Sequence, residues 1–448
     1  MDLTPLEPWI ARKIGATGAL TRAALTAYQL AALNETLAWV RARSPFYRER
    51  LADAPPTLAA LEDLAALPFT TADDIQAEPL RFVCVSQSEI SRVVTLDTSG
   101  TTGHSKRLYF TADDQALTVD FFRAGMSTFT RTGDRVLILL PCARPGSVGD
   151  LLAQALERLG AEGLRHGPVR DVTATLDVLA RTGAAGLVGM PTQVLALARY
   201  PAQPEGLALR FALLTTDFVP RAIIAAVEGA WGCVAYHHYG MTEMGLGGGV
   251  DCVARRGYHL READLLVEVV DPATGVPLPA GQSGEVVFTT LTRRGMPLIR
   301  YRTGDVSHFI PGPCPCGAAL KTLAHITHRR DNVLDLRDGD ALPLCALDEA
   351  LFALEGVIDF SASFERGPSQ DTLRVCLAVH GDESVMRSRA RRALLGLPAL
   401  AEAVAGGALR LVTAATSATH VPSPLKRTFN DGRVTCGEVG GIFPSQMT

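Results

Sequence analysis

Glycines, hydroxyl side chains and a lysine are concentrated in one short segment of the chain, residues 98–107. Glycines let a backbone come close to a phosphate, hydroxyl and amide groups donate hydrogen bonds to it, and a lysine neutralises its charge. The segment therefore predicts a polyphosphate-binding loop, although its order is not the Gly-x4-Gly-Lys-Ser/Thr of a Walker A loop. A solvated turn is the alternative. The residues of this predicted loop are Thr98, Ser99, Gly100, Thr101, Thr102, Gly103 and Lys106.

Three further polar clusters and one lysine follow along the chain. They are Tyr239-Gly240-Met241-Thr242-Glu243, Tyr301-Arg302-Thr303-Gly304-Asp305, Arg329-Arg330-Asp331-Asn332 and, near the C-terminus, Lys426. Each of them alone is compatible with a helix cap, a turn or a surface charge. Because they occur in this order along one chain, we interpret them together as one candidate site.

A separate constellation has the residue types of a metal site. Cys252 and His259 are followed, after two predicted strands, by Cys314 and Cys316 in a turn that contains proline and glycine. Three thiolates and one imidazole suit tetrahedral zinc, and no position would remain open for a substrate. The sequence therefore predicts a structural zinc ion, with free cysteines as the alternative.

Short apolar runs alternate with helical stretches in the segments that must position these residues. Residues 19–62 are predicted to be helical, and strands are predicted at 135–140, 186–190 and 211–214, each followed by a helix. This alternation indicates an α/β fold with parallel sheet covered by helices.

The pattern changes near residue 265. Two strands, 266–270 and 284–288, are joined by a turn with proline and glycine, which favours a small barrel-like subdomain. After Asp331 a strand-helix-strand-helix order predicts a compact α+β domain. We therefore expect a large N-terminal domain, residues 1–331, and a small mobile C-terminal lid, residues 332–448.

Composition excludes several classes of partner. The 448 residues carry a formal net charge of −4 and a pI near 6.2, without the basic surface that nucleic-acid binding needs. No apolar run is long enough for a membrane helix, and the N-terminus lacks a signal-peptide pattern. We therefore expect no nucleic-acid or membrane partner and a cytoplasmic location. Nine cysteines, an odd number, favour thiols or metal ligands over a disulfide framework.

In this order the clusters resemble the adenylate-forming enzymes, the superfamily of acyl-CoA synthetases, adenylation domains and luciferases. Residues 44–48, 67–71 and 297–305 are typical of its phenylacetate-CoA ligase branch. The resemblance implies an AMP-forming ligase that uses ATP and Mg²⁺ to adenylate a carboxylic acid, aryl or arylacetic, and then passes the acyl group to coenzyme A. Because two anions react, catalysis depends on positioning and electrostatics.

The resemblance also implies individual roles. The phosphate loop holds the β- and γ-phosphates, Tyr239 stacks on adenine, Thr242 contacts the α-phosphate and Glu243 binds magnesium. Asp305 binds the ribose hydroxyls, and Lys426 contacts the acyl carboxylate and the α-phosphate. The remaining residues of the implied nucleotide site are Gly240 and Met241 beside the tyrosine, Asp217 near adenine, and Arg329, which with Asp331 forms the hinge of the lid.

Three departures from the family pattern leave alternatives open. They are His104 in the phosphate loop, Asp338 where a glycine lets pantetheine pass, and Leu425 before the catalytic lysine. An adenylating enzyme that transfers to an amine or a carrier-protein thiol is one alternative. A nucleotide-binding zinc protein without turnover is another. Arg144, His237 and His238 are polar candidates for contact with the acid, and the sequence is compatible with a homodimer without fixing the oligomeric state.

Overall fold

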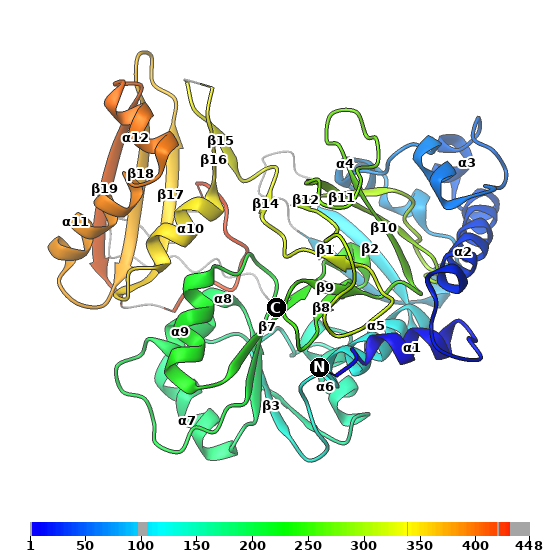
Figure 1. Cartoon of the computed structure of the whole chain (residues 1–448), viewed down its shortest axis with the longest axis horizontal. Coiled ribbons are helices and arrows are strands. Elements are labelled where there is room, and N and C mark those ends of the chain that lie inside the picture. Colours follow the sequence, from blue (N-terminus) through cyan, green and yellow to red (C-terminus); the bar gives the residue numbers. More distant parts are fainter. Residues whose placement is uncertain (1, 97–104, 338, 419–420, 431–448) are drawn as a thin grey trace.

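The computed structural model describes residues 2–96, 105–337, 339–418 and 421–430 (Figure 1). Its largest sheet has eight strands in the order β13-β9-β8-β7-β6-β5-β3-β4. The strands β4, β3, β5, β6 and β7 run parallel, and β8, β9 and β13 continue the sheet in antiparallel pairing. Their bounds are β3 (Arg135–Ile138), β4 (Glu162–Arg165), β5 (Gly186–Gly189), β6 (Phe211–Leu214), β7 (Val234–Tyr239), β8 (Gly249–Asp251), β9 (Tyr258–Leu260) and β13 (Thr322–Leu323).

Helices cover both faces of the parallel part, as the alternating pattern predicted. Successive side chains of a strand point to opposite faces, so Val136 and Ile138 pack in the cluster with α5 and α6, and Leu137 packs in the cluster with α7, α8 and α9. The bounds of these helices are α5 (Ala112–Met126), α6 (Val148–Glu157), α7 (Val172–Thr182), α8 (Pro191–Ala198) and α9 (Arg221–Trp231).

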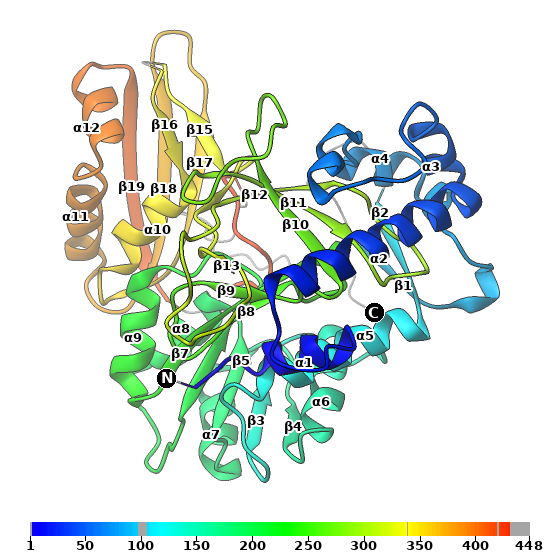
Figure 2. The ribbon, with the colours of Figure 1, turned by 45° about the vertical axis from the view of Figure 1, so that its right-hand side comes forward.

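A second region contains a four-stranded antiparallel sheet, β10-β11-β12-β14, and the pair β1-β2. N-terminal helices lie along this region (Figure 2). The bounds are α1 (Leu6–Lys13), α2 (Arg22–Arg43), α3 (Pro45–Arg50), α4 (Ala72–Ala77), β1 (Ile90–Leu96), β2 (Lys106–Thr111), β10 (Leu265–Val270), β11 (Gly284–Thr290), β12 (Tyr301–Ser307) and β14 (His328–Arg329).

The continuous helix expected over residues 19–62 is wrong in part. Helix α2 ends at Arg43, and Ser44 is extended and accepts a hydrogen bond from the amide of Tyr47 as the N-cap of α3. Pro45 occupies the first position of α3, where a missing amide hydrogen costs nothing. Residues 52–60 are not helical. The N-cap and the proline therefore end α2 and begin α3 within a stretch whose apolar periodicity predicted one helix.

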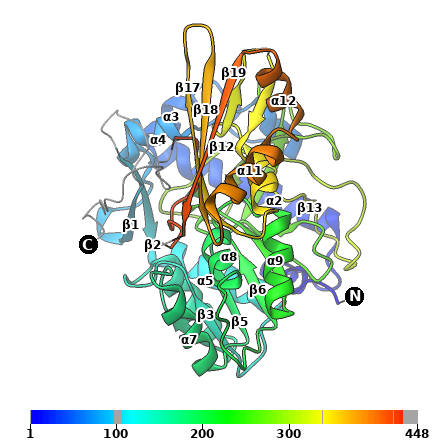
Figure 3. The same cartoon turned by 90° about the vertical axis from the view of Figure 1, so that its left-hand side faces the viewer.

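The described residues after Asn332 form two small sheets with three helices beside them (Figures 1 and 3). Several buried side chains from this region share one apolar cluster with α7, α8 and α9. We retain the boundary between residues 1–331 and 332–448 as a proposal. The bounds are β15 (Val333–Asp335), β16 (Ala341–Pro343), α10 (Leu344–Phe352), β17 (Val357–Glu365), β18 (Asp371–Val379), α11 (Glu383–Leu394), α12 (Pro398–Ala405) and β19 (Leu409–Ser417).

Two further expectations concern membrane helices and the state of the cysteines. Across the described ranges, no helix combines the length and the apolar character needed to cross a membrane. Among the described cysteines outside the predicted zinc site, Cys84, Cys142, Cys233 and Cys345 are free thiols, whereas Cys376 on β18 is disulfide-bonded.

Candidate active site

One cavity of about 340 Å³ gathers most of the described residues that were predicted to bind the nucleotide or to act in catalysis. It lies between the end of β7, the strands β12 and β14, helix α10 and the chain near residue 426. The predicted residues on its wall are Asp217, Tyr239, Gly240, Asp305, Arg329 and Lys426. The fold thus joins positions from five separate segments of the sequence.

The turn after β7 explains Gly240 of the second cluster and Gly245 just after it. A Cβ atom on Gly240 would lie 2.3 Å from the carbonyl oxygen of Leu246, so no other residue fits there. The short 3₁₀ helix η4 (Thr242–Met244) follows and ends at Gly245, whose φ of 74° is left-handed. The chain then reverses into β8, which leaves Tyr239 on the cavity wall and Glu243 buried.

Tyr239, Asp305 and Arg329 form one hydrogen-bonded group. The Tyr239 hydroxyl donates to Asp305 Oδ2 at 2.9 Å, and the Arg329 guanidinium donates to Asp305 Oδ1 at 3.1 Å. Burial raises the pKa of Asp305, and Arg329 and Lys426 oppose that effect. Register explains the geometry, because Asp305 on β12 is paired with Arg329 on β14.

A second group surrounds Glu243. The Lys106 ammonium forms an ion pair with Glu243 Oε1, and the Tyr301 hydroxyl donates to the same oxygen at 3.1 Å. Burial is the largest single influence on the pKa of Glu243 and raises it. The charge and hydrogen bond of Lys106, a backbone hydrogen bond and the charge of Lys426 together outweigh burial, so the pKa lies below its ordinary value. The carboxylate is therefore ionised at neutral pH, as an oxygen ligand of magnesium must be.

Tyr301 belongs to a cluster that the sequence analysis named, but it was given no role of its own. It lies four residues before Asp305 on β12, and its hydroxyl contacts Glu243. The register of β12 shifts between Tyr301 and Asp305, so their spacing does not place both side chains on one face. Only the contact with Glu243 identifies Tyr301 as a site residue.

The segment around Lys426 is tied to the cavity by its neighbour. Arg427 is buried and forms ion pairs with Asp348 on α10 and Asp359 on β17. Its backbone amide donates to Asp217 Oδ2 at 3.0 Å. Asp217, expected near adenine, therefore also positions the C-terminal segment. Lys426 lines the cavity and lowers the pKa of both Glu243 and Asp305.

Some predicted residues lie elsewhere. The loop residues Thr98–Gly103 fall outside the described ranges. Met241 and Thr242 occupy the turn after β7 but are not part of the cavity wall that the described residues form, and neither is Arg144. His237 and His238 do lie on that wall.

The four predicted zinc ligands converge. The Sγ atoms of Cys252 and Cys314 are 3.6 Å apart, and His259 Nε2 is 3.2 Å from the Sγ atom of Cys316. All four side chains are buried, and their ligand atoms lie within 4.8 Å of one another. Thiolates about 2.3 Å from a tetrahedral zinc are separated by a similar distance, so the residues fit a zinc ion.

A histidine cluster stands between the four predicted zinc ligands and the cavity. His325 Nε2 lies 2.7 Å from Asp251 Oδ1, and the rings of His237 and His325 stack at 4.0 Å with an interplanar angle of 15°. A metal ion binds in the plane of an imidazole ring, and one ion cannot lie in two parallel planes. The cluster is therefore a hydrogen-bonded wall of the cavity rather than a second metal site. Asp251 and His325 were not predicted.

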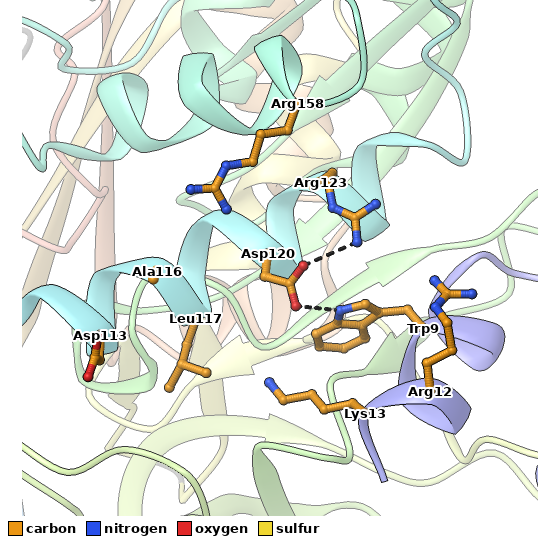
Figure 4. Close-up of a pocket in the computed structure, with 9 residues that line it drawn as sticks. All are labelled: Trp9, Arg12, Lys13, Asp113, Ala116, Leu117, Asp120, Arg123 and Arg158. Atoms are coloured by element: carbon orange, nitrogen blue, oxygen red, sulfur yellow. Dashed lines mark hydrogen bonds and ion pairs between the residues drawn. The ribbon is translucent and has the colours of Figure 1, made fainter. Parts of the chain in front are cut away.

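A larger groove lies on the surface between α1, α5 and α6 (Figure 4). Its volume is about 580 Å³, yet none of the predicted site residues lines it. The Trp9 indole donates to Asp120 at 2.7 Å, Arg123 pairs with Asp120, and Lys13 lies 2.6 Å from Asp264. These paired charges identify the groove as the seam where α1 docks on α5.

Comparison with known sequences agrees with this geometry. The sequence pattern of the family described as "AMP-binding enzyme" matches residues 35–291. The phenylacetate-coenzyme A ligase of Thermus thermophilus is 32% identical over 76% of this chain and 78% of its own length. The Pseudomonas putida enzyme of the same name is 30% identical over 71% and 74%.

Solved structures show the same fold. A 2-hydroxyisobutyryl-CoA ligase in the postadenylation state superposes with a TM-score of 0.77 at 22% identity, covering 93% of this chain and 90% of that one. The same ligase in the thioesterification state gives a TM-score of 0.65 at equal identity and coverage. The overall arrangement of this chain is thus more similar to the first of these two structures.

Proposed function

The chain belongs to the AMP-binding enzyme family, and from that premise we propose that it is an AMP-forming acid–thiol ligase. In its first half-reaction a carboxylate oxygen attacks the α-phosphorus of ATP, and the bond to pyrophosphate breaks. In the second, the sulfur of coenzyme A attacks the acyl carbon and AMP leaves. The observation that carries this proposal is the convergence of Tyr239, Asp305 and Lys426 on one cavity.

The nucleotide would occupy the side of the cavity formed by Tyr239 and Asp305. Asp305 offers two carboxylate oxygens, a geometry that matches the two ribose hydroxyls. Its hydrogen bonds to Tyr239 and Arg329 hold the carboxylate in place before the nucleotide arrives. The purine would stack on the Tyr239 ring, which is buried and backed by Tyr258 at 5.5 Å.

Two cations would act on the reacting groups. Lys106 follows the predicted phosphate loop and would bind the outer phosphates, and Lys426 would neutralise charge between the acyl carboxylate and the α-phosphate. Glu243 would hold a magnesium ion, which supplies positive charge beside the phosphates when bound. Lys426 reaches the cavity from the proposed lid, so adenylation requires that lid to be docked.

The zinc ion would have a structural role. Cys314 and Cys316 precede β13, which pairs with β9 opposite His259, and His325 follows in the next few residues. Four protein ligands would staple this loop to β8 and β9. The staple would thereby fix the His325 wall of the cavity.

Acid-dependent exchange of labelled pyrophosphate into ATP tests the first half-reaction. With an aryl acid, an arylacetic acid or a small aliphatic acid we expect exchange, and on addition of coenzyme A we expect AMP and an acyl thioester in equal amounts. A carrier-protein thiol or an amine would replace coenzyme A if exchange is rapid but no thioester forms. The absence of exchange with every acid of the panel would refute the proposal.

Substitution of Asp305 tests the proposed contact with the ribose of the nucleotide. Asp305→Asn keeps the shape of the side chain and removes its charge, so we expect a higher KM for ATP. The KM for the acid should change little, because the ribose contact lies away from the acyl group.

A further inference from the structure

His238 points to the opposite side of β7 from its two neighbours. Side chains alternate along a strand, so His237 and Tyr239 share one face and His238 occupies the other. His237 and Tyr239 contact the rings of His325 and Tyr258, whereas His238 contacts Phe121 and Phe122 of α5. A purine stacked on Tyr239 would therefore lie on the other face of β7 from His238, and the acyl group is the part of the substrate that would lie beside His238.

The surroundings of His238 are apolar apart from one hydroxyl. Its ring meets Phe122 edge to face at 5.8 Å and lies 6.2 Å from Phe121. Its Nδ1 atom lies 2.8 Å from Thr215 Oγ1. Burial lowers the pKa of His238 to about 4, so the ring is neutral at physiological pH. A neutral imidazole has one donor nitrogen and one acceptor nitrogen.

The second nitrogen of His238 is the informative atom. Nε2 is shielded from water and has no hydrogen-bond partner among the described residues, although His238 lines the cavity. The hydroxyl of Thr216 and the Nδ1 atom of His237, two residues that also line the cavity, are buried without a described partner as well. Buried polar atoms are normally paired, so three unpaired atoms on one wall indicate a ligand that pairs with at least one of them.

Backbone strain occurs at the same place. Thr216 has a φ of 77°, which is unusual for a β-branched residue. The neighbouring contacts hold it there, namely Thr215 with His238 and Asp217 with the amide of Arg427. Strained residues of this kind persist where the surrounding structure fixes them, often at ligand sites.

We propose that the acid activated by this protein carries a hydroxyl or amino substituent and that His238 selects it through Nε2. This inference rests on the proposed function and narrows its substrate class. When Thr215 donates to Nδ1, Nε2 carries the proton and acts as a donor, and in the other tautomer it accepts. Either tautomer pairs with a hydroxyl or amino group, and neither pairs with a hydrocarbon. The rings of Phe121 and Phe122 give the rest of the acyl group an apolar contact.

Matched pairs of acids provide the test. Pyrophosphate exchange is measured for phenylacetate against the hydroxyphenylacetates, benzoate against the hydroxy- and aminobenzoates, and butanoate against the hydroxybutanoates. We expect the best substituted acid to exceed its plain partner by about 10- to 100-fold in kcat/KM, because the plain acid leaves a buried hydrogen-bonding atom of the site unpaired.

Variants at the same position assign the preference to the imidazole. In His238→Phe we expect the ratio within the best pair to fall toward one while the KM for ATP is unchanged, and in His238→Gln we expect part of the preference to remain. His380→Gln, in the lid and away from the cavity wall, should keep the wild-type ratio.

The outcomes separate this inference from the proposed function. Wild-type protein that uses the plain acids as well as their substituted partners overturns the inference and leaves adenylation intact, and so does a His238→Phe variant that keeps the full preference. If His238→Phe does not fold, the wild-type ratio and His238→Gln decide. Exchange with no acid of either kind removes the proposed function and this inference with it.

Discussion

Lys106 and Glu243 contact each other in this structure, although both are proposed to bind one complex of nucleotide and magnesium. A buried ion pair is stabilising only while each charge keeps a partner, and removing one partner costs about 3–5 kcal/mol. Phosphate oxygens can replace the carboxylate beside Lys106, and a magnesium ion can replace the ammonium beside Glu243. Nucleotide binding would thus exchange partners rather than leave either charge unpaired.

Lys426 is the residue whose loss should affect chemistry most selectively. Lys426→Ala removes the only cation proposed to bridge the carboxylate and the α-phosphate, so we expect pyrophosphate exchange to fall about 100-fold or more. Binding of ATP, measured by calorimetry, should weaken far less. Lys321→Ala is the matched control, because Lys321 lies over Phe309 and away from the cavity wall. Unchanged exchange in Lys426→Ala would remove the lysine from the mechanism.

His238 should also make stability depend on pH. Its pKa is lowered to about 4 in the folded chain, below the ordinary value of 6.5. Between these values the unfolded chain binds the proton and the folded chain does not, so stability falls as pH drops from about 6.5 to 4. In His238→Phe this contribution is absent. We therefore expect its thermal midpoint to fall less than that of the wild type between pH 7 and pH 5, as measured by calorimetry. Parallel falls would contradict the assignment.

At the scale of elements, the proposed zinc cluster and the cavity share a wall. Strand β8 ends at Asp251, which contacts His325, and Cys252 follows directly as a proposed zinc ligand. β13 joins the sheet beside β9 through the pairing of Thr322 with His259. A change at the zinc ligands should therefore reach the nucleotide side of the cavity through the loop that carries His325.

Removal of zinc tests this connection. Purified protein should contain about one equivalent of zinc, and a chelator should lower both its thermal midpoint and its affinity for ATP. Cys316→Ser should reproduce both effects. Cys142→Ser exchanges a free thiol outside the cluster and should leave both unchanged. Zinc-free protein with wild-type stability would refute the structural role.

At the scale of the whole molecule, the proposed lid is docked on the large domain. Arg199 after α8 donates to the carbonyl oxygens of Phe352 at 2.6 Å and Leu354 at 3.0 Å, and also to that of Val357. Apolar side chains of both regions pack in one cluster around this contact. The arrangement brings Lys426 to the cavity, and a swing of the lid for thioester formation would have to break it.

The Arg199 contact should favour the first half-reaction over the second. Arg199→Ala removes three hydrogen bonds that hold the lid in this arrangement. We expect pyrophosphate exchange to fall at least about 10-fold, which is the loss that a single bond to a charged group, worth about 1.5 kcal/mol, would produce. Transfer from a preformed acyl adenylate to coenzyme A should fall less. Arg210→Ala, which breaks a pair with Asp134 inside the large domain, is the control. An equal loss in both half-reactions would contradict a selective role.

The sequence by itself determined the α/β class, because apolar alternation along 135–140, 186–190 and 211–214 requires sheet covered by helices. It also indicated which residue types could bind phosphate and zinc, since those depend on donor atoms and local spacing, whereas the ribose contact of Asp305 was implied by the family resemblance. Element boundaries were predicted less accurately. At Ser44 a single N-cap residue ends the predicted helix, although apolar residues continue to recur at helical spacing.

Only the tertiary structure decided how the segments meet. The pairing of Asp305 with Arg329, the hydrogen bond of Tyr301 to Glu243 and the link from Asp217 to Arg427 join residues that local spacing cannot relate. The unpartnered Nε2 of His238 likewise depends on burial against α5, which belongs to another part of the chain. Contacts between distant segments are set by packing of the whole fold, and no short stretch of sequence contains that information.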